Sequence, residues 1–360
     1  MQLDFNDQTS ECLRNVTFIL HTRNRPDFLL RALDYYDYEL GCFKARIIIS
    51  DASDDSEYEV IKKSLGEKKY QIDVHLLHSP SNCSLSIRLN EVLNVVDTPY
   101  VMLAADDDLY FTGWIPSAVS LMEGDVSYGT VYGHTLKFGL EQYAPFGAVV
   151  DAAIAEYRNP PIRWLEGHSP EGRLTSLGRS DWATVGWYAL QRKKLLQIIV
   201  ESAIRYDIDG YLFEKLLVFC QAALFKTRKC DHIYLARQND TKRREPFSFK
   251  HNRNAIDEFL RAASAILSQH GGVDGVNADR IVRSAFDGEI LQYMRADKKQ
   301  RLRRWLGSVP SLQGLWYRLR ARRLSDSEFE QDPNLPIFCN ESLLRHHVDI
   351  LTKVVHRLGS

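Results

Sequence analysis

The sequence YVMLAADDD, residues 100–108, places three consecutive aspartates directly after a short apolar run. An apolar run of this length without a charged residue is typical of a strand that is buried on both faces. The aspartates Asp106, Asp107 and Asp108 therefore follow the carboxyl end of a predicted strand. In an open parallel sheet, that is the end at which ligands bind.

Three more apolar runs precede this one, at residues 16–21 (VTFILH), 45–50 (ARIIIS) and 74–77, and we predict a strand for each. Apolar residues recur at helical spacing between the runs, with one helix starting at Pro26 and another over residues 87–96. Strands that alternate with helices predict an α/β fold with a mostly parallel sheet covered by helices on both faces.

The rest of the chain is less regular. Residues 129–190 contain several prolines and glycines, and we expect long loops there, which often carry substrate contacts. A helix is predicted over residues 211–225 and a brief strand over residues 233–236. The chain is mostly helical beyond about residue 249. We therefore expect a catalytic domain in residues 1–248 and a helical C-terminal extension in residues 249–360.

The composition is that of a soluble globular protein. The formal net charge of −1 gives no general attraction to nucleic acid, so we expect no nucleic-acid partner. The six cysteines form no C-x-x-C pair, and the polar, acidic residues 1–14 do not resemble a secretion signal. No apolar run reaches the roughly 18 residues that a membrane helix needs. These features together predict a cytoplasmic protein with reduced thiols.

Three adjacent carboxylates at a strand end repel one another, and a bound cation would offset that repulsion. Hard oxygen ligands favour Mn²⁺ or Mg²⁺, and Mg²⁺ is often held by one or two carboxylates together with substrate phosphates. We therefore predict that Asp106, Asp107 and Asp108 hold a metal ion. The alternative is a solvated acidic turn that caps a following helix, which we expect to begin near Thr112.

Three segments resemble the GT-A glycosyltransferases, specifically the inverting, family-two-like group. They are FILHTRNRPDFLLRAL (18–33), RIIISDASDD (46–55) and SIRLNEVLNVVDTPYVMLAADDDLY (86–110). In that group a strand followed by T-x-N-R-P opens the fold, and a helix with R-x-N precedes T-P-Y, a strand and the metal-binding D-x-D. The combination across residues 16–110 is specific, although each motif alone is weak.

The resemblance implies a GT-A fold, that is, a Rossmann-like, mixed and mostly parallel sheet flanked by helices. Residues 16–110 would bind the nucleotide and residues 111–248 the acceptor. It implies an inverting, metal-dependent transfer from a nucleotide-diphosphate sugar, most often a UDP-sugar. The acceptor would be a hydroxyl of a glycan or a lipid-linked molecule, in the synthesis of surface polysaccharide.

The resemblance also assigns residues to the donor. Those implied to line the nucleotide-sugar site are Thr22, Asn24, Arg25, Asp51, Arg88, Asn90, Asp106, Asp107 and Arg237. Asp51 would meet the base edge, and Arg88 and Arg237 would lie near the diphosphate. The alternatives are an Asx-turn that only shapes its loop for Asp51, and surface charges for Arg25 and Arg88.

One departure from the family pattern concerns the metal site. The usual aspartate two residues before the final Asp-Asp pair is Ala105 here if that pair is Asp107 and Asp108. If Asp106 and Asp108 form the D-x-D instead, nothing is missing. His232 and His251 are candidates for a third metal ligand, although a single histidine is more often structural.

The transfer also needs a general base for the acceptor hydroxyl. Glu214, just before the apolar helix LLVFCQAALFK, is the first candidate because it resembles the family's acidic motif. Asp209 is the second, with helix capping as its alternative role, and Asp181 is the third.

Aromatic residues in the preceding segment give a candidate for the acceptor-sugar platform. The segment DWATVGWYALQR contains Trp182, Trp187 and Tyr188, which would form the platform or else part of the core.

Residues 295–323 are strongly basic, and their apolar residues recur at helical spacing. They predict an amphipathic helix that lies on an anionic membrane, or else one that packs on the catalytic domain or on a second subunit.

Two other functions compete with glycosyl transfer. A sugar-phosphate nucleotidyltransferase would need a glycine-rich loop after its first strand, and HTRNRPDF has no glycine. A degenerate, non-catalytic GT-A sugar-binding module would have lost the metal carboxylates, which are present here.

Overall fold

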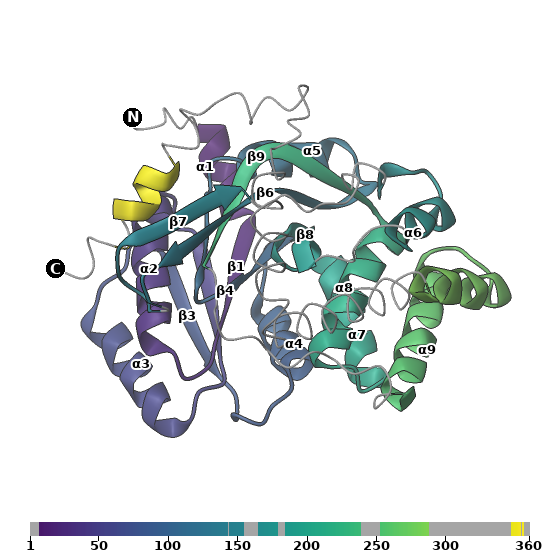
Figure 1. Cartoon of the computed structure of the whole chain (residues 1–360), viewed down its shortest axis with the longest axis horizontal. Coiled ribbons are helices and arrows are strands. Elements are labelled where there is room, and N and C mark those ends of the chain that lie inside the picture. Colours follow the sequence, from purple (N-terminus) through teal and green to yellow (C-terminus); the bar gives the residue numbers. More distant parts are fainter. Residues whose placement is uncertain are drawn as a thin grey trace, which may run out of the picture.

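The computed structural model describes residues 7–142, 144–154, 165–178, 184–238, 253–287, 347–353 and 355. Within them, nine strands form one sheet in the order β3-β2-β1-β4-β8-β6-β9-β5, with β7 paired to β6 (Figure 1). Helices cover both faces of this sheet, as the alternation of apolar runs predicts.

The first half of the sheet is parallel. It consists of β3 (Asp73–His78), β2 (Arg46–Asp51), β1 (Val16–Thr22) and β4 (Tyr100–Ala105). The register pairs Thr22 with Asp51, and the neighbouring residue of β1 with the last residue of β4. The predicted ligand residues therefore follow strands that end at the same edge of the sheet, which confirms the predicted arrangement.

The second half is mixed. β8 (Leu190–Arg192) runs antiparallel to β4 and to β6 (Tyr128–Leu140). β9 (Lys226–Gln238) lies parallel to β6, and the short β5 (Asp108–Tyr110) pairs antiparallel with β9. β7 (Val149–Ile154) pairs with β6. The last aspartate of the acidic triplet thus begins a strand, and it does not cap a helix.

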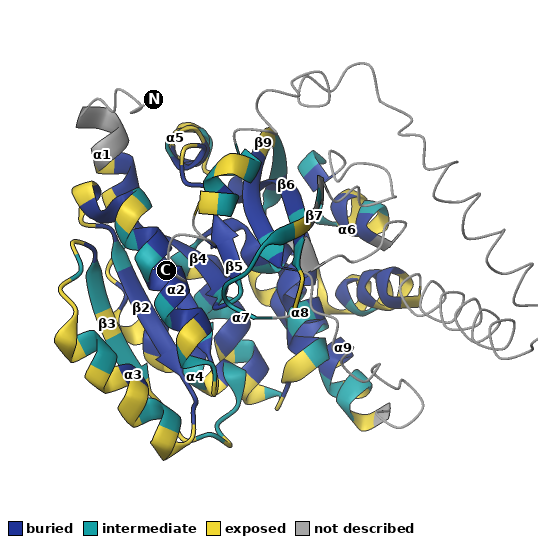
Figure 2. Ribbon diagram, turned by 60° about the vertical axis from the view of Figure 1, so that its left-hand side comes forward, coloured by how far each residue is buried: buried dark blue, intermediate teal, exposed yellow. Residues whose placement is uncertain are grey.

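Alternating side chains of the central strands pack into two separate cores, one on each face of the sheet. Phe18 and Leu20 belong to the core under α2, whereas Ile19 belongs to the core under α4, α7 and α8. These strands are buried in Figure 2, and β3, at the edge, is more exposed. The helical elements include α1 (Asp7–Arg14), α2 (Pro26–Leu40), η1 (Gly41–Phe43), α3 (Asp55–Glu67), α4 (Leu85–Val95), α5 (Ile115–Gly124), α6 (Pro170–Gly178), η3 (Thr184–Tyr188), α7 (Lys193–Arg205), α8 (Gly210–Leu224) and α9 (Arg253–His270).

Three expectations about the elements were wrong in detail. The brief strand expected over residues 233–236 is the end of the 13-residue β9, and the irregular region contains the 13-residue β6. In β6, glycine stands where a neighbour approaches closely, since a Cβ on Gly133 would meet the His232 carbonyl oxygen at 2.2 Å. Glycine weakens a sequence-based strand prediction for that reason. The helix expected near Thr112 begins at Ile115.

The C-terminal part of the described chain packs against the catalytic part. On α9, Phe259 meets Phe219 of α8 with ring centroids 6.5 Å apart. Further along, the His347 ring lies 4.4 Å from the Phe111 ring, and Leu351 is buried in the core under α2. The expected boundary at residue 248 remains a prediction. Residues 295–323 lie outside the described residues.

No helix in the described part of the chain is both long enough and apolar enough to cross a bilayer.

Candidate active site

A cavity of about 650 Å³ lies where β1 and β4 end, beside η3, α8 and the end of β9. Its walls carry charges of both signs. The charged residues that line it are Arg23, Arg25, Arg88, Lys137, Arg237, Asp106, Asp107, Asp108 and Glu214. Six of the nine predicted donor-site residues line this cavity, namely Thr22, Arg25, Arg88, Asp106, Asp107 and Arg237.

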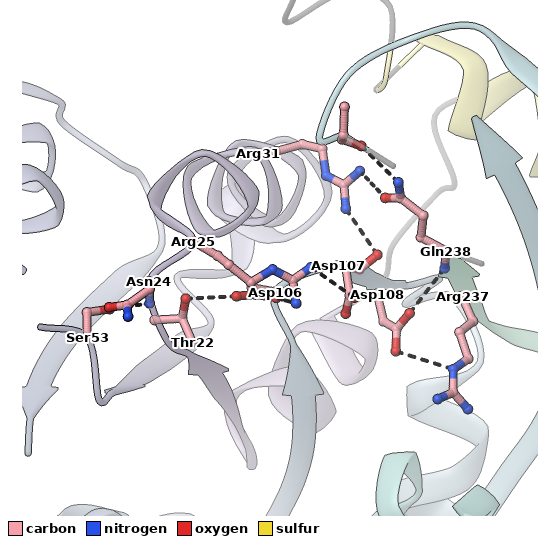
Figure 3. Close-up of polar contacts among 11 residues, drawn as sticks. Thr22, Asn24, Arg25, Arg31, Ser53, Asp106, Asp107, Asp108, Arg237 and Gln238 are labelled. Carbon is pink, nitrogen blue, oxygen red and sulfur yellow. Dashed lines mark hydrogen bonds and ion pairs between the residues drawn. The ribbon is translucent and has the colours of Figure 1, made fainter. Parts of the chain in front are cut away.

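Asp106 is buried, with 2% of its surface exposed. The Thr22 hydroxyl donates to its Oδ2 at 2.8 Å, and Arg25 Nη1 lies 3.0 Å from its Oδ1 (Figure 3). Burial raises the pKa of Asp106 from 3.8 to about 7, because these two partners offset only part of the cost of desolvating the charge.

Asp107 and Asp108 meet different cations. Arg25 Nη2 lies 2.9 Å from Asp107 Oδ2, so one guanidinium bridges two neighbouring aspartates. Asp108 accepts a hydrogen bond of 3.2 Å from the backbone N–H of Gln238, and Arg237 Nε lies 3.9 Å from its Oδ2. The pairing of β5 with β9 sets this geometry, since it places Asp108 opposite Arg237. Burial and then the Asp107 charge raise the pKa of Asp108.

The turn that carries Asp106, Asp107 and Asp108, here called the acidic turn, is held in place by Arg31. The sequence motifs did not indicate this residue. Its side chain is fully buried. It donates at 2.8 Å to Gln238 Oε1 and at 3.0 Å to the Asp107 carbonyl (Figure 3). It also donates at 2.8 Å to the Pro145 carbonyl. A signal was present in the sequence, because Arg31 falls between Leu29 and Leu33 on α2, where a charge among apolar residues indicates a buried partner.

The predicted base-contacting residue, Asp51, is fully buried and does not line the cavity. Its Oδ1 accepts from the backbone N–H and the hydroxyl of Ser53, at 3.0 and 2.5 Å, and its Oδ2 lies 2.6 Å from His78 Nδ1. Asn24 exchanges side-chain and backbone hydrogen bonds with Asp54, and its backbone is in the left-handed region at φ 54°. Both residues therefore shape the turns at this edge of the sheet.

Arg88 and Asn90 are two residues apart on α4, and side chains at that spacing do not share a face of a helix. Arg88 lines the cavity and donates to the Ser50 carbonyl at 3.3 Å, whereas Asn90 does not line it. Burial lowers the pKa of the Arg88 guanidinium, and the nearby Asp209 charge partly opposes that effect.

His21 also lines the cavity, and the sequence reasoning missed it. Both of its ring nitrogens are buried without a hydrogen-bond partner among the described residues. Burial, and then the charge of Arg88, lower the pKa of His21 from 6.5 to about 3, so the ring is neutral.

Glu214 from α8 and Trp187 and Tyr188 from η3 also line the cavity. Trp187 contacts His21, with ring centroids 5.8 Å apart. The second candidate base, Asp209, precedes α8, is exposed, and makes no side-chain capping hydrogen bond. The geometry thus brings Glu214, and not Asp209, to the cavity.

The other candidates do not reach this site. His232 is exposed on β9 and does not line the cavity. Asp181, Trp182 and His251 lie outside the described residues.

The donor atoms around the acidic triplet fit a hard divalent cation. They are carboxylate oxygens on a cavity wall, the ligand type that Mg²⁺ and Mn²⁺ prefer. Within the described ranges, no three His, Cys, Asp or Glu side chains converge on one point. An ion at Asp106, Asp107 or Asp108 would therefore need phosphate oxygens or water to complete its coordination.

The family model of glycosyl transferase family 2 matches residues 17–199, which run from β1 to α7. The chain belongs to this family. It is therefore a nucleotide-sugar glycosyltransferase, and the GT-A fold prediction is confirmed. The match ends before α8, so Glu214 lies outside it.

Solved structures that are similar to this glycosyltransferase include TarS residues 1–349 from S. aureus. The identity is 12%, the alignment covers 81% of this chain and 78% of that chain, and the TM-score is 0.47. The same TarS fragment in complex with UDP-GlcNAc is 13% identical over 76% of this chain and 72% of that chain, with a TM-score of 0.43. No curated protein sequence matches this chain.

Proposed function

We propose that this family 2 glycosyltransferase is metal-dependent and inverting. In this proposal it transfers a sugar from a nucleotide-diphosphate sugar, with a UDP-sugar as the first candidate, to a hydroxyl of a glycan or lipid-linked acceptor. The observation that supports the proposal most is the acidic triplet, which shares one cavity with four arginines, a lysine and Glu214. The positive charges of the arginine and lysine side chains suit binding of a diphosphate, and the carboxylates suit binding of a divalent metal ion.

Residues in the cavity and directly behind it would have different roles. Arg88 and Arg237 bind the diphosphate, and Thr22 and Arg31 hold the acidic turn in position. A Mn²⁺ or Mg²⁺ ion, held by carboxylates of Asp106 to Asp108 and by the donor phosphates, would supply positive charge opposite the departing nucleoside diphosphate.

Glu214 would accept the proton of the acceptor hydroxyl. The hydroxyl oxygen attacks the anomeric carbon from the face opposite the diphosphate, and the bond from that carbon to the phosphate oxygen breaks. Attack from that face inverts the anomeric configuration.

The location and pathway are also proposals. The resemblance of the sequence motifs to makers of surface polysaccharide supports a cytoplasmic enzyme in such a pathway. Residues 295–323 would contact the inner face of the membrane or a second subunit, because their basic and apolar residues suit either surface.

A thermal-shift screen against UDP-, GDP-, CMP- and dTDP-sugars, each with and without Mn²⁺, tests the donor and the metal together. We expect one nucleotide-sugar to raise the unfolding temperature, and only with Mn²⁺ present. Product anomers measured by NMR with the stabilising donor then test inversion. Retention would contradict the proposed chemistry. Pyrophosphate release from a nucleoside triphosphate and a sugar phosphate would instead indicate a nucleotidyltransferase.

A further inference from the structure

The positively charged side chain of Arg25 already pairs with part of the acidic triplet. The Arg25 guanidinium lies 3.0 Å from Asp106 Oδ1 and 2.9 Å from Asp107 Oδ2, so it bridges two of the three carboxylates (Figure 3). It also lies 4.3 Å from the centroid of the Phe28 ring. A divalent ion that used these carboxylates would have to share them with Arg25 or displace it.

We propose that Arg25 exchanges partners when the donor binds. Without a donor it neutralises Asp106 and Asp107, and with a donor and a metal ion it contacts the diphosphate instead. Arg25 therefore competes with the lone ion and couples metal binding to nucleotide binding. This inference depends on the metal dependence proposed above.

The chemistry of the guanidinium suits both partners. Its planar fork binds carboxylate and phosphate in the same bidentate way, so release from the aspartates costs little if a phosphate takes their place. A lone ion offers no such replacement, and it would bring a second positive charge against the same carboxylates. The absence of three convergent ligand side chains in the described part of the chain also leaves a lone ion with few protein ligands.

The position of Arg25 allows this exchange. It lies between the end of β1 and Pro26, the first residue of α2, and 31% of its side chain is exposed in the same cavity. Arg31 differs in this respect, because it is fully buried and donates to three acceptors. Arg25 can therefore leave Asp107 without opening the core, whereas Arg31 cannot.

Linkage gives the measurable consequence. Arg25 weakens binding of the metal ion while it pairs with the aspartates, and it strengthens binding of the diphosphate when it contacts the phosphates. The nucleotide must therefore raise the affinity for the metal, and the metal must raise the affinity for the nucleotide by the same factor. Removing the guanidinium should tighten the binding of the lone ion and reduce that factor.

The test is Mn²⁺ binding, measured from the electron paramagnetic resonance signal of free Mn²⁺, with and without UDP. The variants are Arg25→Met, which keeps an apolar stem beside Phe28, and Arg23→Met as the matched control. Arg23 lines the same cavity from the same loop and forms no ion pair with the aspartates among the described residues. Thermal unfolding checks that both variants fold.

Without UDP, we expect Arg25→Met to bind Mn²⁺ about tenfold more tightly than the unaltered protein, and Arg23→Met to change the affinity less than about threefold. With UDP, the factor by which the nucleotide raises Mn²⁺ affinity should fall clearly more in Arg25→Met than in Arg23→Met. Unchanged Mn²⁺ affinity in Arg25→Met, or an equal gain in both variants, would overturn the inference. If the unaltered protein binds no Mn²⁺ even with UDP, the proposed metal dependence itself fails.

Discussion

Two acidic residues near the start of α8 have different surroundings. Glu214 lines the same cavity as the acidic triplet, as do Trp187 and Tyr188. Asp209 is exposed just before the helix. A general base must reach the acceptor hydroxyl, so position in the cavity favours Glu214.

Glu214→Gln should therefore keep the donor affinity and lose turnover. Losses of about 10²-fold or more in kcat are typical when a general base is removed. Asp209→Asn should lose much less, because its side chain does not line the cavity. Steady-state kinetics and donor titrations on both variants check this. Normal turnover in Glu214→Gln with an inactive Asp209→Asn would reverse the roles, and two active variants would make Asp181 the next residue to change.

His21 makes folding sensitive to acid. Its pKa is lowered to about 3 in the folded protein, so the unfolded chain takes up a proton near pH 6.5 that the folded protein does not. The neutral His21 ring therefore contributes fully to the free energy of unfolding above pH 6.5. That contribution is lost progressively as the pH falls from 6.5 toward 3. Between pH 7.5 and 5, the unaltered protein should lose about 2 kcal/mol more unfolding free energy than His21→Phe. Urea unfolding at both pH values tests this, and equal losses would contradict it.

At this scale, the sequence predicted the residues of the acidic triplet better than their partners. The aspartates follow an apolar strand, and that placement is visible in the sequence. The partners of Asp106 and Asp107, Thr22 and Arg25, lie more than 80 residues away, and only strand pairing brings them close. The enclosure of the Asp51 carboxylate by Ser53 and His78 was not visible either, since it depends on how two turns pack.

Among the elements, α2, the acidic turn and β9 are joined by one side chain. Arg31 of α2 donates to the Asp107 carbonyl and to Gln238 at the end of β9. Burial lowers its pKa to about 10, which still leaves it charged at neutral pH. Loss of a buried charged donor leaves its acceptors without partners and is costly.

Arg31→Met should reduce the free energy of unfolding by about 3 kcal/mol. Arg46→Met is the control. Arg46 pairs at the surface with Asp73 and Asp97, and its loss should cost less than about 1 kcal/mol. Urea unfolding of the three proteins gives both values. A loss in Arg31→Met no larger than that in Arg46→Met would show that Arg31 does not hold these elements together.

The elements of the first half of the sheet were predictable because each strand there is one unbroken apolar run. β6 and β9 were not, for a physical reason. β9 begins with the charged sequence KTRKCDH, and β6 is interrupted by glycines that allow close approach of β9 and of Phe225. Their pairing with each other supplies the stability that their local sequence does not indicate.

In the molecule as a whole, the end of the described chain completes the core under α2. Leu351 is 1% exposed there, whereas Val276, also in the C-terminal part, is 84% exposed. Leu351→Ser should therefore reduce the free energy of unfolding by about 2–3 kcal/mol. Val276→Ser should change it by less than about 0.5 kcal/mol. Equal stability of the two variants in chemical unfolding would show that residues 347–355 do not pack on the catalytic part.

The central claim is that the acidic triplet binds the donor through a divalent ion, and isothermal titration of UDP tests it most directly. The titration is run once with Mn²⁺ and once with EDTA, on the same preparation. We expect at least about tenfold weaker binding in EDTA, since the ion would supply the link between Asp106 to Asp108 and the diphosphate. Equal affinity under the two conditions would contradict the claim.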